Sequence, residues 1–175
     1  MSPQGSSKKR SAAVLFASRF GTTEVVARAL ERGLKEAGMQ TLCARTGEIP
    51  PKSLRDYDLI CVGGPTEIFT ATRQVKDFLS AMGGVGVAGR FGFAFDTKLG
   101  SRMSGSAARF IEHALDDHGL HMIAGRESAI VTSRKDGGRI VGAVLREGEE
   151  SRFEQLGVRV GRAAENALGS IEGGA

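Results

Sequence analysis

Short apolar runs and amphipathic helical patterns alternate along most of this chain, which leaves few folds open to it. The runs at 12–17 and 91–95 contain only apolar residues and glycine. Such runs are typical of strands buried on both faces of a parallel sheet. Strands are predicted at 12–17, 41–44, 58–63 and 91–95, and strand-forming residues return at 120–123 and 129–132.

Helices are predicted where apolar residues recur every three or four positions between the strands. Thr22 or Thr23 can cap a helix that runs to Ala37, and Thr72 can cap the next one. Further helices are expected at about 106–117 and 149–168. The alternation predicts an α/β fold, with a five-stranded parallel sheet and helices on both faces. Asp136-Gly137-Gly138 can also turn a hairpin into residues 139–145.

Length and charge favour one domain without a nucleic-acid partner. The chain fits a single domain at 12–168, with a flexible basic head at 1–11 and a flexible tail at 169–175. The formal net charge is 24 − 20 = +4, and Lys8, Lys9 and Arg10 in the head supply three of these charges. A basic head is weak support for nucleic-acid binding. Because no apolar stretch is long enough to span a membrane and no signal peptide is visible, we expect a cytoplasmic protein.

The loop after the first predicted strand combines hydroxyl groups, a glycine and a helix start. The N–H groups and dipole of a helix N-terminus favour a phosphate, and hydroxyls add further donors. The loop has neither the lysine of a triphosphate-binding loop nor Gly-x-Gly-x-x-Gly, which favours a monophosphate. An ordinary threonine N-cap is the alternative interpretation. The loop is Ser18-Arg19-Phe20-Gly21-Thr22-Thr23.

Two other patterns point to structure rather than chemistry. Residues 84–89 match Gly-x-Gly-x-x-Gly, but they follow a predicted helix and lead into a strand, the reverse of a dinucleotide site. We therefore expect a simple turn there. The three histidines straddle a helix end without the spacing of a zinc site, so no metal is expected. Cys43 and Cys61 lie in apolar runs and are predicted to be buried, reduced thiols.

Two further loops, taken with residues 18–23, make the chain resemble the flavodoxin family. Gly63-Gly64-Pro65-Thr66 follows the third predicted strand, and Phe95-Asp96-Thr97-Lys98 follows the fourth. The resemblance covers most of 12–168. Flavodoxin is itself the standard example of strand order 2-1-3-4-5 with FMN bound where the order reverses. The resemblance therefore implies that strand order and FMN as the cofactor.

The resemblance also implies which residues contact FMN. The first loop would hold the phosphate, and the loops after the third and fourth strands would flank the isoalloxazine ring. The candidate cofactor-binding residues are Ser18, Arg19, Phe20, Gly21, Thr22, Thr23, Pro65, Thr66, Glu67, Ile68, Phe69, Thr70, Asp96, Thr97, Lys98 and Gly100.

The chain departs from the aromatic flavin sites of carrier flavodoxins. It has no Trp, and its sole Tyr57 precedes the third predicted strand. Phe69 is the candidate ring on one side of the flavin, and Leu99 or Met103 would cover the other side. Residues 66–70 contain no glycine, and β-branched residues resist positive φ. We therefore expect this segment to avoid any turn that requires positive φ.

Three functions remain open from the sequence. The first is an FMN-binding redox protein of the flavodoxin type that transfers electrons between protein partners. The second is a small flavoenzyme that reduces quinones or oxidises a porphyrinogen by two-electron transfer. The third is a binding module that keeps the fold without the cofactor. The flavin supplies the redox chemistry in the first two, and the protein sets its potential and access.

Overall fold

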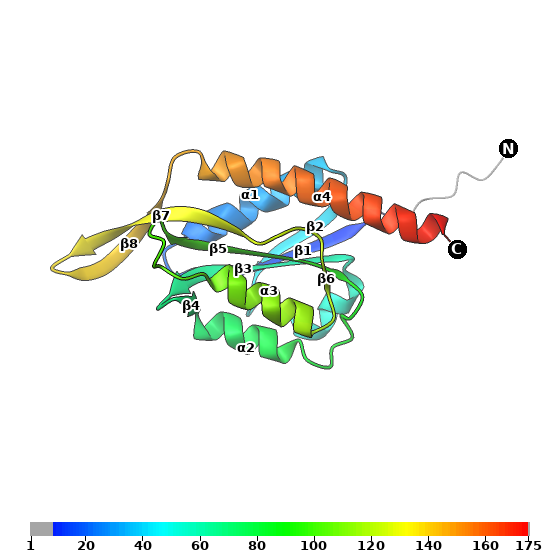
Figure 1. The fold of residues 1–175 in the computed structure, drawn as a ribbon, viewed down its shortest axis with the longest axis horizontal. Coiled ribbons are helices and arrows are strands. Elements are labelled where there is room, and N and C mark those ends of the chain that lie inside the picture. The colour runs from blue at the N-terminus through cyan, green and yellow to red at the C-terminus, as the bar shows by residue number, and fades with distance from the viewer. Residues whose placement is uncertain (1–8, 175) are drawn as a thin grey trace.

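The computed structural model describes residues 9–174, which form one mostly parallel sheet with helices on both faces (Figure 1). The strands are β1 (Ser11–Phe16), β2 (Gln40–Arg45), β3 (Leu59–Glu67), β4 (Thr70–Ala71), β5 (Phe91–Leu99), β6 (His121–Met122), β7 (Glu127–Asp136) and β8 (Arg139–Leu145). The helices are α1 (Thr22–Glu36), α2 (Arg73–Ala81), α3 (Ala107–Asp117) and α4 (Glu149–Gly173), with a short 3₁₀-helix at Pro51–Asp56.

The strand order confirms the predicted doubly wound sheet and adds strands to it. The order is β2-β1-β3-β5-β7-β8, and the first five of these strands run parallel, as in order 2-1-3-4-5. The predicted hairpin is also confirmed, since β8 pairs with β7 antiparallel and Gly137 and Gly138 turn between them with positive φ. The short strands β4 and β6 pair with β3 and β5.

Helices cover both faces of the sheet, as the alternation predicts. α1 and α4 lie on one face, and α2 and α3 lie on the other (Figure 1). Val14 and Phe16 belong to the core under α1 and α4, whereas Ala13 and Leu15 belong to the core over α2 and α3. Both sets are fully buried, which is why the first strand is apolar at every position.

Glycines bring α1 and α4 unusually close together. A Cβ on Gly33 would lie 2.0 Å from the carbonyl oxygen of Glu154, and a Cβ on Gly157 would lie 2.2 Å from that of Leu30. Such distances to backbone atoms leave no room for a side chain. The two helices therefore pack with their backbones in near contact.

Two strands run further than predicted. β3 continues to Glu67 and β5 to Leu99, so much of the two segments predicted as loops is extended strand. Pairing between the strands accounts for the difference, because Gly64 faces Asp96 and Pro65 faces Thr97 in the parallel register. Both segments therefore belong to paired strands that extend to the carboxyl-terminal edge of the sheet.

The start of α1 also differs from the prediction. Gly21, with a φ of 87°, is the N-cap of α1 and has no side chain to donate or accept a hydrogen bond, so the prediction of a threonine cap is wrong. The buried Thr23 hydroxyl instead bonds to the Thr97 hydroxyl at 2.8 Å. The predicted cap of the next helix is confirmed, since Thr72 Oγ1 accepts from the Val75 N–H.

The ends of the domain extend past the predicted boundaries. Residues 1–8 of the predicted head lie outside the described residues, and Ser11 is already the first residue of β1. α4 continues to Gly173, so it includes most of the segment expected as a tail. Arg10 reaches this helix end, and two of its nitrogens donate to the Glu172 carboxylate at 2.7 Å.

The remaining structural expectations agree with the fold. Residues 84–89 form the turn that joins α2 to β5. Cys43 and Cys61 are both buried and free. Across residues 9–174, the helices lack an apolar stretch that could span a membrane.

Candidate functional site

A cleft of about 130 Å³ lies at the carboxyl ends of the parallel strands. Its walls come from the β1–α1 loop, the end of β3, the end of β5 and the β7–β8 hairpin. This is the edge at which doubly wound sheets bind ligands. The lining residues are Arg19, Phe20, Thr22, Thr23, Pro65, Thr66, Glu67, Thr97, Lys98, Leu99, Val131, Ser133, Ile140, Gly142 and Ala143.

The β1–α1 loop brings hydrogen-bond donors to this cleft. Gly21 takes a positive φ, and its N–H donates to Ser18 Oγ at 3.0 Å, which shapes the turn before the helix. The first N–H groups of α1 have no partners within the helix, and the helix dipole adds partial positive charge at the same place. Thr22 lines the cleft beside them. These groups fit a phosphate.

Arg45 fixes the outer side of this loop. Its guanidinium donates to the carbonyl oxygen of Ser18 at 3.2 Å and to the Glu24 carboxylate at 2.8 Å. Glu24 lies in the first turn of α1, where a carboxylate is stabilised by the helix dipole. The loop is therefore held at both ends before any ligand arrives.

A tight turn at the end of β3 forms the opposite wall. Glu67 pairs with Thr70, which leaves Ile68 and Phe69 as a two-residue turn with φ values of 45° and 68°. The expectation that this segment avoids positive φ is therefore wrong. Pairing of β3 with β4 imposes the turn, because two-residue hairpins favour positive φ at both central positions. A Phe69 bridge to Gly105 supports it.

Asp96 lies in β5 and connects this strand to β3 and α3. Its side chain is fully buried, and Oδ2 accepts hydrogen bonds from Thr66 Oγ1, Ser106 Oγ and the Ala108 N–H. Asp96 therefore anchors the start of α3 and the end of β3 rather than presenting its carboxylate to the cleft. Its other oxygen, Oδ1, has no partner among the described residues.

The structure brings nine of the sixteen predicted residues into the lining of one cleft. They are Arg19, Phe20, Thr22, Thr23, Pro65, Thr66, Glu67, Thr97 and Lys98. Ser18 and Gly21 shape the first loop behind this lining. Ile68, Phe69, Thr70 and Gly100 lie in or after the turns at the cleft edge.

Sequence reasoning missed the part of the site that comes from the β7–β8 hairpin. Val131, Ser133, Ile140, Gly142 and Ala143 line the cleft, although none of them was a candidate. The Asp-Gly-Gly turn correctly predicted the hairpin itself. Its position beside the cleft depends on β7 pairing with the end of β5, which no local pattern reveals.

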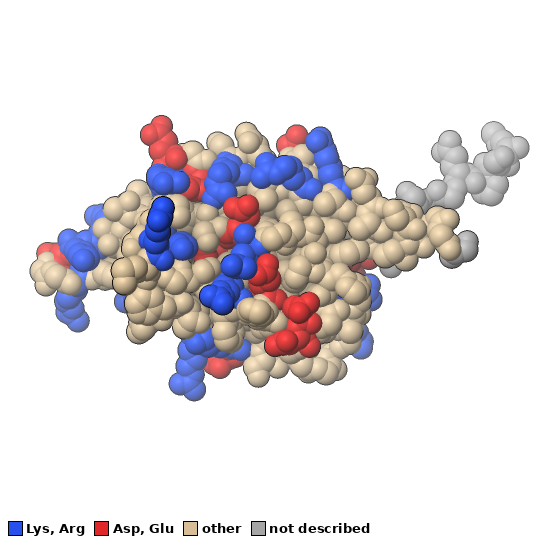
Figure 2. Space-filling view, viewed as in Figure 1, with Lys and Arg blue, Asp and Glu red and all other residues tan. Residues whose placement is uncertain are grey.

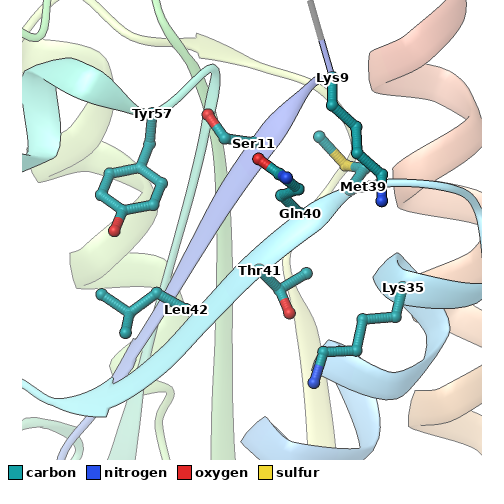
Figure 3. A pocket seen from close by; sticks show the side chains of 8 residues that line it. All are labelled: Lys9, Ser11, Lys35, Met39, Gln40, Thr41, Leu42 and Tyr57. Carbon is teal, nitrogen blue, oxygen red and sulfur yellow. The ribbon is translucent and has the colours of Figure 1, made fainter.

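A larger hollow of about 610 Å³ lies at the other end of the sheet, near the starts of β1 and β2 (Figure 3). It is lined by Lys9, Ser11, Lys35, Met39, Gln40, Thr41, Leu42 and Tyr57. Its lining includes no residue from the start of a helix, and Lys35 pairs with Glu31 at 3.2 Å. The cleft at the carboxyl ends is the better ligand site because its donors converge.

Comparison of the sequence with known protein families shows which family the chain belongs to. The sequence model described as Flavodoxin matches residues 14–155. The chain belongs to the flavodoxin family. FMN is the cofactor of this family, as the sequence predicts, and a redox role as a flavoprotein follows from it.

Curated relatives carry the name NAD(P)H dehydrogenase (quinone). The protein of Paracoccus denitrificans is 30% identical over 116 residues, covering 53% of this chain and 55% of that protein. A protein named NAD(P)H dehydrogenase (quinone) 3, from Rhizobium meliloti, is 29% identical over 122 residues, covering 56% and 57%. The chain thus spans about half the length of the curated relatives it matches.

Solved structures confirm the fold. A flavodoxin from the domain Archaea superposes with a TM-score of 0.71 at 17% identity, covering 89% of this chain and 99% of that one. Rubredoxin oxygen:oxidoreductase from Desulfovibrio gigas gives 0.73 at 18% identity, covering 91% of this chain and 38% of that one.

The donors at the cleft fit FMN chemically. The N–H groups at the start of α1 and the Thr22 hydroxyl suit its phosphate. A Cβ on Gly21 would meet no atom within 4 Å, so the loop faces open space where a phosphate can approach. Phe20, Leu99 and Ile140 supply apolar surface for a ring. The volume of about 130 Å³ is below that of most ligand pockets, so a flavin ring would lie partly at the mouth.

Proposed function

We propose that this protein is an FMN-dependent electron carrier that exchanges electrons with protein partners. The observation that carries the proposal is the juxtaposition of the α1 phosphate site with a shallow cleft whose rim is exposed and apolar. Ile68, Phe69 and Leu99 on that rim are 89%, 65% and 42% exposed. A ring at this mouth would be covered on one side and open to a partner on the other.

The bound flavin would supply the redox chemistry, and the chain would bind and orient it. Backbone N–H groups of α1 and the Thr22 hydroxyl would hold the phosphate. Phe69 would lie against the ring from the β3–β4 turn, and Leu99 would cover it from the end of β5. Glu67 and Lys98 stand beside these positions and would set the charge around the ring.

Quinone reduction by NAD(P)H is the second candidate function. It is favoured by the printed names of the curated relatives, which share about 30% identity with about half of this chain. In that case the same cleft would admit a small planar acceptor directly against the flavin. The two functions differ in whether the protein turns over a quinone without a second protein.

Anaerobic assays of the FMN-loaded protein separate these functions. For a carrier, we expect slow oxidation of NADH or NADPH by the protein and a quinone alone, and rapid transfer from the dithionite-reduced protein to a protein acceptor. Fast NAD(P)H-to-quinone turnover by the protein alone would assign it to the enzymes instead. A colourless protein that ignores added FMN would exclude both functions.

A further inference from the structure

The segments that line the cleft, taken with the residues that continue directly from them, carry the whole excess of positive charge in this chain. These segments, 18–23, 65–70, 97–105 and 132–143, are called the cleft segments below. They contain six of the 24 basic and two of the 20 acidic residues, so the rest of the chain has 18 of each sign. The six basic residues are Arg19, Lys98, Arg102, Arg134, Lys135 and Arg139.

The fold does not use most of these charges. Within residues 9–174, Arg19 pairs loosely with Glu67 at 3.8 Å and lies over the Phe20 ring, and the ion pairs include none of the other five. Arg134, Lys135 and Arg139 are exposed on the β7–β8 hairpin, which projects from the body of the molecule (Figure 1). Figure 2 shows basic side chains on this projecting end. Clustered like charges repel one another, so this arrangement costs folding energy.

Exposed apolar side chains accompany the basic ones. Ile68 and Met103 are 89% and 81% exposed on the cleft segments, and Ile140 and Val141 on the hairpin are 48% and 53% exposed. Exposed apolar side chains together with exposed charges are typical of transient protein interfaces.

We propose that the β7–β8 hairpin and the cleft rim form the docking surface for an acidic redox protein. The inference rests on the proposed carrier function and adds the chemistry of the partner. Charge complementarity selects an acidic partner, because the net charge of the cleft segments is positive. A second copy of this chain would present the same sign and be repelled.

The proposed step is electron transfer between the flavin and the redox group of the partner. With a reduced iron–sulfur protein, each partner molecule loses one electron to bound FMN. Two partner molecules are oxidised for each FMN that is fully reduced, and the solvent supplies the protons. The hairpin would steer the partner to the exposed edge of the ring and would take no part in the chemistry.

The test uses stopped-flow kinetics of the FMN-loaded protein with a reduced, acidic [2Fe–2S] ferredoxin as the probe. We expect the second-order rate constant to fall at least about tenfold between about 20 mM and about 500 mM NaCl. Arg134→Glu with Arg139→Glu should lower the rate at low salt by about tenfold and remove most of the salt dependence.

A matched variant controls for the change in total charge. Arg159→Glu with Arg162→Glu makes the same change on exposed positions of α4, away from the cleft. It should alter the low-salt rate by less than about threefold. Equal effects of the two double variants would overturn the docking surface. Circular dichroism should show that both variants remain folded.

FMN titration separates the docking surface from the proposed function. The hairpin variant should bind FMN within about twofold of the parent, because its charges do not serve the phosphate. If the hairpin variant loses FMN affinity, these charges serve the cofactor and the inference is wrong. If the parent itself ignores FMN, the proposed function fails and the inference fails with it. Salt-sensitive dimerisation, or duplex DNA binding lost in the hairpin variant, would assign the surface to another occupant.

Discussion

At the scale of single residues, two neighbouring threonines at the start of α1 have different roles. Both threonines line the cleft, but the buried Thr23 hydroxyl is already bonded to the Thr97 hydroxyl. Thr22→Ala should weaken FMN binding by about tenfold, because a hydrogen bond to a charged phosphate contributes about 1.5–3 kcal/mol. Its free energy of unfolding should change little.

Thr23→Ala is the matched variant for that prediction. It leaves the buried Thr97 hydroxyl without its partner, so the free energy of unfolding should fall by about 1–3 kcal/mol. Flavin fluorescence and urea denaturation measure the two quantities. Equal losses of FMN affinity in both variants would contradict this division of roles.

Phe69 holds a strained backbone conformation that β3–β4 pairing imposes. It holds a φ of 68° while its ring is 65% exposed, and such conformations cost non-glycine residues about 1–3 kcal/mol. Phe69→Gly should raise the free energy of unfolding by about 1 kcal/mol and weaken FMN binding. A variant that is more stable and binds FMN as tightly as the parent would show that the ring has no contact with the flavin.

The two buried cysteines should make the free energy of unfolding depend on pH. Burial raises the pKa of the Cys43 thiol to about 12, and it raises the pKa of Cys61 as well. The unfolded thiols ionise near their ordinary pKa of about 8.5 while the folded ones stay protonated, so unfolding releases protons above that pH. The free energy of unfolding should fall as the pH rises from about 9 to 12. Cys43→Ser with Cys61→Ser should flatten this fall in urea titrations.

At the scale of elements, the contact between α1 and α4 depends on glycine. Gly157→Ala should lower the free energy of unfolding by about 1–3 kcal/mol, because its Cβ would lie 2.2 Å from the Leu30 carbonyl oxygen. A Cβ on Gly169, in the same helix, would meet no atom within 4 Å. Gly169→Ala should therefore raise the free energy of unfolding by up to about 1 kcal/mol. Denaturation curves of both variants provide the measurement, and a neutral Gly157→Ala would contradict the close packing.

The elements also show where reasoning from sequence succeeds. The apolar runs predict the parallel strands because burial on both faces leaves a local pattern. The ends of β3 and β5 were not predictable, since Pro65 and Thr97 are strand residues only through their pairing with each other. The prediction for the Ile68–Phe69 turn is wrong for the same reason. Pairing of β3 with β4 overrides the preference of both residues for negative φ.

At the scale of the whole molecule, the candidate site combines parts that the sequence reveals to different degrees. The candidate phosphate loop is local, so its residues 18–23 stand out in the sequence by their composition. The hairpin wall at Ile140 and Gly142 joins the cleft only because β7 lies next to β5 in the sheet. The sequence suggests Asp96 as a residue beside the ring, but its carboxylate is buried and bonds to Thr66 and the start of α3, because β5 extends through this position.

The proposed function requires that the start of α1 hold the phosphate of FMN and that the cleft cover its ring. The most direct measurement compares the dissociation constants of FMN and riboflavin by quenching of flavin fluorescence. Riboflavin has the same ring without the phosphate, so it loses the charge-assisted hydrogen bonds. We predict that FMN binds at least about tenfold more tightly than riboflavin. Equal affinity for the two flavins, or no quenching by either, would show that the start of α1 does not hold the phosphate of FMN.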